Sequence, residues 1–139
     1  MSYAYPAVWT LDDDADDQLL LQTAFNERHP AIAVTSLPTF GALLTTIQQA
    51  NPLPSLLLVD LQMPGVTGLE VLLYLRRQAA YSQLPIIILS DSEEGVARQQ
   101  ALALGAAEFL LKPFSYSELL ELVTQLVVRW SLVSAELAL

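Results

Sequence analysis

The stretch from Leu56 to Gly65 constrains the fold of this chain more than any other. Four apolar residues run into a single aspartate, Asp60, and a Pro64-Gly65 turn follows. An apolar run of this length, bounded by turn residues, is typical of a strand buried on both faces of a parallel sheet. Open α/β sheets place their sites at the carboxyl ends of such strands. We therefore expect Asp60 to be a nucleophile that other site residues surround.

Apolar strands and helical patterns alternate along the chain. Strands are expected at residues 7–11, 32–37, 56–60, 85–89 and 108–111, and helices at about residues 15–28, 38–50, 69–78, 91–104 and from 115 onward. This alternation predicts an α/β fold, a flavodoxin-like doubly wound sheet of five parallel strands with five helices in three layers. The expected strand order, 2-1-3-4-5, puts the switch point between strands one and three. Asp12 and Asp13 end strand one, so they should meet Asp60 there.

The composition limits the classes of protein to consider. The 139 residues fit one domain, and a hydrophobic fraction of 53% with 15% charged residues suits a sheet covered on both faces. A net charge of -9 leaves no basic stripe for nucleic acid. No apolar run reaches the roughly 18 residues that span a bilayer, and no signal peptide pattern is present. Without cysteines, the chain is compatible with the cytosol. We expect a cytoplasmic protein that binds neither nucleic acid nor membrane.

The acidic residues at the expected switch point indicate a metal site. Crowded carboxylates from Asp12, Asp13 and Asp60 would raise each other's pKa, and a hard cation such as Mg²⁺ resolves that repulsion while leaving positions for phosphate oxygens. Lys112, the only lysine, ends strand five and can place a charge against a phosphoryl oxygen. Ser90 ends strand four and offers a hydroxyl. This set suits the formation of an aspartyl phosphate.

Four segments together resemble the response-regulator receiver domain, the CheY-like family. They are residues 11–17, 58–68, 89–90 and 111–114, and each lies at the end of an expected strand. The resemblance covers about residues 6–128, the expected core of a single domain spanning 1–139. It implies a two-component phosphorelay in which Asp60 accepts a phosphoryl group from a histidine kinase or phosphotransfer domain. It also implies a phosphoacceptor rather than an enzyme. Because 139 residues leave no room for an output domain, we expect the output to pass through a downstream protein partner.

The resemblance also implies roles for single residues. Asp13, Asp60 and the backbone carbonyl of Gln62 would bind Mg²⁺ directly, and Asp12 through a water. Lys112 would contact the phosphoryl group and precede a cis Lys112-Pro113 bond. Ser90 and Phe109 would be the switch residues, although Phe109 suits plain core packing equally well.

Three residues beside the site would modulate it. Gln62 and Ser92 hold positions that tune the phosphoryl lifetime in the family. Asp91 is larger than the Ala or Gly usual at its position, and it adds negative charge where an anion must enter unless its side chain turns outward. The alternative function is therefore a phosphorylation-independent receiver-like module for interaction or dimerisation. A small phosphohydrolase with an Asp nucleophile is disfavoured, because Gln62 stands where its second aspartate would be. A flavodoxin-like electron carrier is disfavoured as well, because the acidic residues after strand one would repel the phosphate of FMN.

The two outermost helices raise further expectations. In the first helix, the expected buried stripe is Leu20, Leu21, Ala24 and Phe25, whereas Asp14, Asp16 and Asp17 are expected to be a solvated helix start. The last helix is apolar beyond one stripe, and residues 129–139 are expected to continue it. Its extra apolar side chains predict a partner or homodimer surface, with a back-folded or disordered tail as the alternative.

Overall fold

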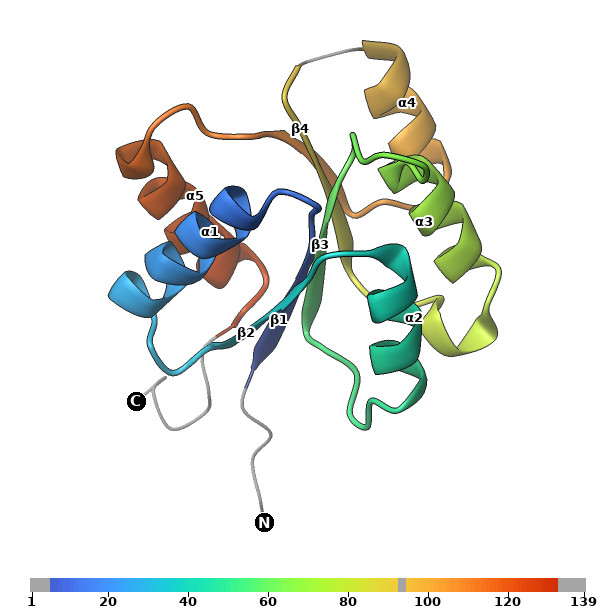
Figure 1. Ribbon diagram of the computed structural model, residues 1–139, viewed down its shortest axis with the longest axis horizontal. Helices are drawn as coiled ribbons and strands as arrows, with labels where there is room; N and C mark the ends of the chain where they lie inside the picture. The colour runs from blue at the N-terminus through green and yellow to red at the C-terminus, as the bar shows by residue number, and fades with distance from the viewer. Residues whose placement is uncertain (1–5, 93–94, 133–139) are drawn as a thin grey trace.

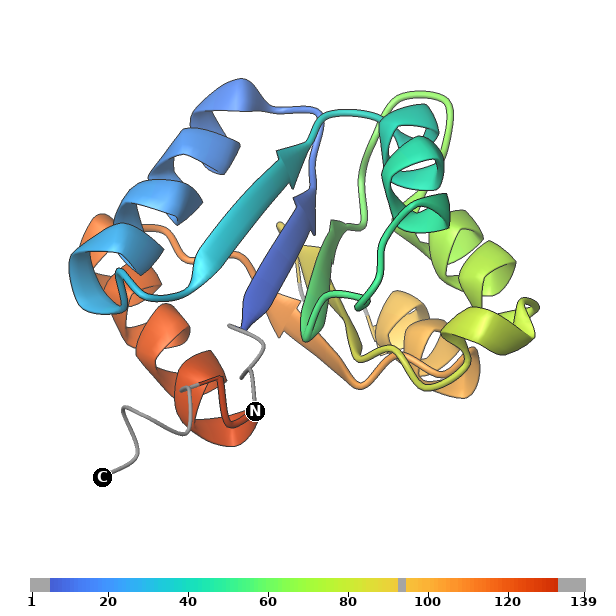
Figure 2. The same cartoon turned by 90° about the horizontal axis from the view of Figure 1, so that it is seen from below.

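The computed structural model describes residues 6–92 and 95–132. Five parallel strands form one sheet in the order β2-β1-β3-β4-β5. The strands are β1 (Ala7–Leu11), β2 (Ala33–Leu37), β3 (Leu56–Asp60), β4 (Ile86–Ser90) and β5 (Glu108–Leu111). The helices are α1 (Ala15–Arg28), α2 (Phe40–Gln48), α3 (Gly68–Arg76), α4 (Gly95–Ala103) and α5 (Tyr116–Arg129), with a 3-10 turn η1 (Ala79–Tyr81). Helices α1 and α5 cover one face, and α2, α3 and α4 cover the other (Figures 1 and 2). The predicted α/β fold and strand order are confirmed.

Strand β3 is buried along its whole length and contributes side chains to both hydrophobic clusters of the protein, one on each face of the sheet. Leu57 and Val59 pack in the cluster on one face of the sheet, and Leu56 and Leu58 pack in the cluster on the other. Successive side chains of a strand point to opposite faces, so an unbroken apolar run is what a central strand between two helical layers requires. This confirms the interpretation of the run before Asp60.

Capping side chains set the helix boundaries. Asp14 Oδ1 accepts hydrogen bonds from the backbone N–H groups of Asp16 at 2.9 Å and Asp17 at 3.1 Å, and α1 spans the predicted residues. Ser115 Oγ accepts from the Glu118 N–H at 3.1 Å, as the capping spacing predicts. The Glu118 carboxylate accepts from the Phe114 N–H rather than from the cap residue itself. Polar N-caps, Asp14 and Ser115, thus define where α1 and α5 begin.

The expected stripe of α1 is wrong at one position. Leu21, Ala24 and Phe25 are buried, but Leu20 is 48% exposed, and Gln18 is buried in its place. Gln18, Leu21 and Phe25 lie three and four residues apart, so they share one helix face, which points at the sheet and α5. The polarity of Gln18 hid this position from a reading based on hydrophobic periodicity.

Helix α5 ends earlier than expected. It stops at Arg129, and Ser131 adopts a φ of 51°. The chain then turns back, because the Leu132 N–H donates to the Val127 carbonyl at 2.9 Å and the Leu132 side chain is buried. The Trp130 indole N–H also donates to Glu108 at 2.7 Å. The predicted continuation of the helix is therefore wrong for residues 130–132, and its remainder, 133–139, lies outside the described residues.

Two further observations concern the backbone and the membrane. The cis bond found in the described chain is Asn51-Pro52, so the expected cis bond at Lys112-Pro113 is wrong. Trans is the lower-energy form of an X-Pro bond, by about 0.5–1 kcal/mol. Within residues 6–92 and 95–132, none of the helices has the length and hydropathy to cross a bilayer.

Candidate functional site

Three carboxylates meet at the carboxyl edge of the sheet, between β1 and β3. Asp60 is the last residue of β3 and is 5% exposed, Asp12 is half-buried just after β1, and Asp13 is exposed. One carboxylate oxygen from each lies within 4.8 Å of the others. The structure therefore brings together the three acidic residues that the sequence predicts, at the predicted switch point.

The loop after Asp60 returns closely to the end of β3. The Gly68 N–H donates to the Leu61 carbonyl at 2.9 Å. A Cβ atom on Gly68 would lie 2.7 Å from the Asp60 carbonyl oxygen, so only glycine fits here. Within the loop, the Gln62 N–H donates to Asp60 Oδ1 at 3.3 Å. Glycine at the start of α3 thus lets the helix begin directly against the backbone at the end of β3.

The ammonium group of Lys112 lies among the carboxylates. Its Nζ is 3.1 Å from Asp60 Oδ1, 3.2 Å from Asp12 Oδ2 and 3.2 Å from Asp17 Oδ2. The backbone places it there, because the Lys112 N–H donates to the Ser90 carbonyl at 2.7 Å. One cation is therefore shared by three anions from the β1–α1 loop, from helix α1 and from strand β3.

Burial and charge shift the pKa values of these groups. Burial raises the pKa of Asp60 to about 6, against the lowering effect of the Lys112 charge. Burial also raises the pKa of Asp12. Burial lowers the pKa of Lys112, but the negative charges of Asp12 and Asp60 outweigh it, and the net pKa lies above its usual value. The site thus holds a charged lysine beside carboxylates that are costly to ionise without further positive charge.

The donor set fits a hard divalent cation. Lys112 pairs with Asp12, Asp17 and Asp60, and the carboxylate of Asp13 lies beside those of Asp12 and Asp60, so the site has an excess of negative charge in an oxygen-rich environment. Mg²⁺ takes oxygen ligands, binds through one or two carboxylates and retains waters. The cluster of Asp12, Asp13 and Asp60 meets these requirements. The role of the Gln62 carbonyl as a further ligand stays a prediction.

The expected switch residues are both buried. Ser90 is fully buried, and its hydroxyl donates to the Ser92 carbonyl at 2.8 Å and accepts from the Ser92 N–H at 3.2 Å. Phe109 is 2% exposed in the core, with the guanidinium carbon of Arg98 at 5.5 Å from its ring centre. In this state Ser90 therefore bonds within its own loop, and Phe109 packs as a core residue. Their switch roles stay predictions.

Asp91 follows Ser90 at the carboxyl end of β4, and its side chain is exposed. Its negative charge can therefore act on an anion that approaches the site, but its side chain does not fill the buried space around Asp60. Whether it modulates the site, as expected for Asp91, Gln62 and Ser92, stays a prediction.

Sequence reasoning missed two residues of the site. The sequence predicts that Asp17 belongs to a solvated helix start, yet it contacts Lys112. Hydrophobic periodicity predicts no role for Gln18, yet its amide donates to the carbonyl of Asp12 beneath the loop of Asp12 and Asp13. A signal for Asp17 exists in the sequence: it lies in the first turn of α1, at the helix end nearest to Asp12 and Asp13, and can therefore face the same edge of the sheet. Neither the contact of Asp17 with Lys112 nor the burial of Gln18 follows from residue spacing alone.

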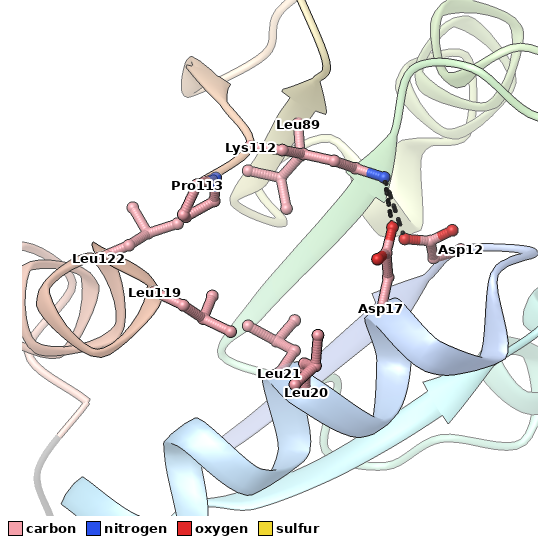
Figure 3. A pocket seen from close by; sticks show the side chains of 9 residues that line it. All are labelled: Asp12, Asp17, Leu20, Leu21, Leu89, Lys112, Pro113, Leu119 and Leu122. Carbon is pink, nitrogen blue, oxygen red and sulfur yellow. Dashed lines mark hydrogen bonds and ion pairs between the residues drawn. The ribbon is translucent and has the colours of Figure 1, made fainter. Parts of the chain in front are cut away.

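An apolar pocket adjoins the site on the side of α1 and α5 (Figure 3). Leu20 and Leu21 of α1 face Leu119 and Leu122 of α5 across it. Asp12, Asp17 and Lys112 form its polar end, with Leu89 beside Lys112, and Pro113 lies next to Leu122. The exposed Leu20 therefore lines a hollow between two helices rather than the core.

Comparisons with known proteins identify the family. A family model described as the response regulator receiver domain matches residues 8–124. The phosphate regulon transcriptional regulatory protein PhoB of Rhizobium meliloti is 40% identical over 83 residues, which are 60% of this chain and 37% of that protein. The chain spans less than half the length of the curated PhoB relatives it matches.

Solved structures give the same fold. A response regulator in red light signaling of R. palustris has a TM-score of 0.81 at 26% identity, covering 90% of this chain and 93% of that chain. The phosphorylated cyanobacterial phytochrome response regulator RcpA has a TM-score of 0.82 at 22% identity, covering 92% of this chain and 95% of that chain. The second likeness concerns the fold alone.

Proposed function

The chain belongs to the response regulator receiver family of two-component systems, and on that premise we propose that it accepts a phosphoryl group on Asp60 and signals through a protein partner. The contact between Lys112 Nζ and Asp60 Oδ1, at 3.1 Å inside the cluster of Asp12, Asp13 and Asp60, carries this proposal. A buried carboxylate at a strand end, with a fixed ammonium and an acidic metal site beside it, is suited to phosphoryl transfer.

Asp60, Lys112 and the acidic cluster have different roles in the proposed phosphoryl transfer. An oxygen of ionised Asp60 attacks the phosphorus of the donor, and the bond from phosphorus to the donor's leaving atom breaks as the new O–P bond forms. Lys112 neutralises charge on a phosphoryl oxygen, and to do so it exchanges one of its carboxylate partners for that oxygen. Asp12, Asp13 and Asp60 would hold Mg²⁺, which supplies positive charge for the phosphoryl oxygens. Burial raises the pKa of Asp60 to about 6, which is still below 7, so the carboxylate is the main form at neutral pH.

The family suggests the class of partner. Receiver domains act with histidine kinases, so the proposed donor is a histidine kinase or a phosphotransfer domain. The expectation that the protein binds no nucleic acid stays a prediction, since PhoB is named as a transcriptional regulatory protein and the match covers 37% of it. Cytoplasmic location, action without an output domain and the homodimer through the last helix likewise stay predictions.

The proposal is tested by forming the adduct. The protein is incubated with Mg²⁺ and a small phosphodonor such as acetyl phosphate, and its intact mass is followed with time. We expect one phosphoryl group on the wild type and none on Asp60→Asn. Beryllofluoride, which mimics an aspartyl phosphate, should change the fluorescence of the wild type only. A wild type that gains no mass and ignores beryllofluoride would sink the proposal.

A second candidate function, a phosphorylation-independent interaction module, is supported by apolar side chains on the surface. Phe114 is 80% exposed beside the site and Val128 is 74% exposed on α5. Exposed Asp91 adds negative charge at the carboxyl end of β4. In this case the wild type would remain unmodified and would self-associate equally with and without beryllofluoride, as measured by sedimentation. A phosphorylated protein whose association depends on the adduct excludes this candidate.

A further inference from the structure

The side chain of Gln18 joins three segments beneath the acidic loop. It is 7% exposed on the first turn of α1. Its Nε2 donates to the carbonyl oxygens of Thr10 at 3.3 Å, Asp12 at 3.1 Å and Leu37 at 3.0 Å. The Thr10 hydroxyl donates in turn to Gln18 Oε1. One amide therefore connects the end of β1, the loop after it and the end of β2.

These bonds determine the backbone in front of Asp13. The Asp12 N–H donates to the Leu37 carbonyl at 3.2 Å, and the Asp14 N–H donates to Asp12 Oδ1 at 2.9 Å. The Asp12 carbonyl, which Gln18 binds, belongs to the same planar peptide unit as the Asp13 nitrogen. Orienting that carbonyl therefore orients the backbone at Asp13.

Asp13 depends on this orientation more than its neighbours do. Its side chain is exposed, whereas Asp12 is half-buried and contacts Lys112, and Asp60 is buried at a strand end. The place of the Asp13 carboxylate within 4.8 Å of the others must come from the backbone rather than from packing. A peptide free to rotate would let this carboxylate leave the cluster.

We infer that Gln18 is a positioning residue for the divalent-cation site: through the Asp12–Asp13 peptide, it holds Asp13 in place to bind the cation with Asp60. The inference rests on the proposed function, because it assigns Gln18 to the acidic site of the phosphoacceptor. Loss of a group that orients a ligand typically weakens metal binding by 10- to 100-fold. We expect a value near the lower end, about tenfold, since Asp12 and Asp60 keep their own positions.

The test compares two glutamines of the same helix. Gln18→Met keeps the length of the side chain but removes its donors. Gln22→Met is the matched control, because Gln22 lies one turn later and donates to the Ser36 hydroxyl at 2.8 Å instead of to the loop. Binding of Mn²⁺ alone is measured by the loss of the free-ion electron paramagnetic resonance signal, and folding is measured by urea unfolding. We expect Gln18→Met to bind Mn²⁺ about tenfold more weakly, and Gln22→Met to bind within about twofold of wild type.

A milder variant keeps the test decisive if Gln18→Met does not fold. Thr10→Val preserves the shape of a buried side chain and removes only the hydroxyl that orients the Gln18 amide. It should weaken Mn²⁺ binding by about two- to threefold, while its unfolding stays cooperative. The inference is overturned if every variant that folds binds Mn²⁺ as Gln22→Met does, because Gln18 would then serve stability alone.

The proposed function and the positioning role of Gln18 are contradicted by different results. If the wild type binds no Mn²⁺ and takes no phosphoryl group, the proposed function fails and Gln18 has no cation to serve. If the wild type does both, and Gln18→Met matches Gln22→Met in Mn²⁺ affinity, only the role of Gln18 fails.

Discussion

The carboxylate of Asp17 lies 3.2 Å from the ammonium of Lys112, almost as close as the carboxylate of Asp60 at 3.1 Å. Asp17 therefore competes with any phosphoryl oxygen that needs Lys112. We predict that Asp17→Asn raises the affinity for beryllofluoride in the presence of Mg²⁺ by about two- to fivefold, because a charged competitor is replaced by a neutral one. The affinity is read from a fluorescence titration.

Asp16→Asn is the matched control for that prediction. Asp16 is the preceding residue, is exposed and lies in the same first turn, so both variants lose one charge near the helix start. The ion pairs of Lys112 involve Asp17 and not Asp16. Equal affinities in the two variants would mean that net charge alone, rather than competition for Lys112, governs the site.

The stability of the metal-free protein should depend on pH through Asp60. Its pKa is raised from 3.8 to about 6 by burial, so between these values the folded state binds a proton that the unfolded chain does not. Stability therefore falls as pH rises from about 4 to about 6, by up to about 2–3 kcal/mol. Asp60→Asn should lose much of this fall and be more stable than wild type at pH 7.5. Urea unfolding in the presence of a chelator measures both.

Mg²⁺ should reverse the effect of pH on the wild type. A cation that binds the ionised carboxylates stabilises the folded state according to its concentration and affinity. We expect the wild type to gain stability at pH 7.5 with added Mg²⁺ and Asp60→Asn to gain less. A fall in stability with pH that is the same in both proteins would assign the titration to another group, of which Asp12 is the first candidate.

Asp91 should slow phosphorylation by charge alone. It is exposed at the end of β4, so it does not fill the site. Asp91→Ala and Asp91→Asn should therefore gain phosphorylation rate equally, by about two- to fivefold at low salt, and the gain should shrink as salt screens the charge. The rate is measured by intact mass with acetyl phosphate. A gain for Asp91→Ala but not for Asp91→Asn would indicate steric obstruction instead.

Arg76 should stabilise the face of the sheet opposite α1 and α5. Its guanidinium donates to the carbonyls of Gly105 at 3.1 and 2.9 Å, of Tyr81 at 2.8 Å and of Leu84 at 2.7 Å. Arg76→Met leaves these acceptors without the donor and should lower the free energy of unfolding by about 2–3 kcal/mol.

The neighbouring exposed residue provides the control for Arg76. Arg77→Met removes the same charge and should change stability by less than about 0.5 kcal/mol. Both are measured by urea unfolding at pH 7.5. If the two variants lose the same stability, the carbonyl contacts of Arg76 contribute little and the loss reflects helix propensity alone.

Much of the site could be predicted because it depends on strand ends. Asp12, Asp60, Ser90 and Lys112 each follow an apolar run, and parallel strands present their carboxyl ends at one edge. The predictions that were wrong concern side chains whose burial or contacts differ from what their residue type indicates. Gln18 is polar yet buried, Leu20 is apolar yet half-exposed, and Asp17 contacts Lys112 from another element. The early end of α5 depends on Leu132 folding back onto the helix, which hydrophobic periodicity does not indicate.

The sequence by itself determined the fold class, the strand order and the edge where the carboxylates meet, because burial of an apolar strand is a local property repeated along the chain. Only the tertiary structure decided how the charges pair. One ammonium lies between Asp12, Asp17 and Asp60, and one buried amide binds carbonyls of two strands and the loop between β1 and α1. Such pairings depend on distances of a few ångströms between residues far apart in the sequence, so no spacing along the chain can specify them.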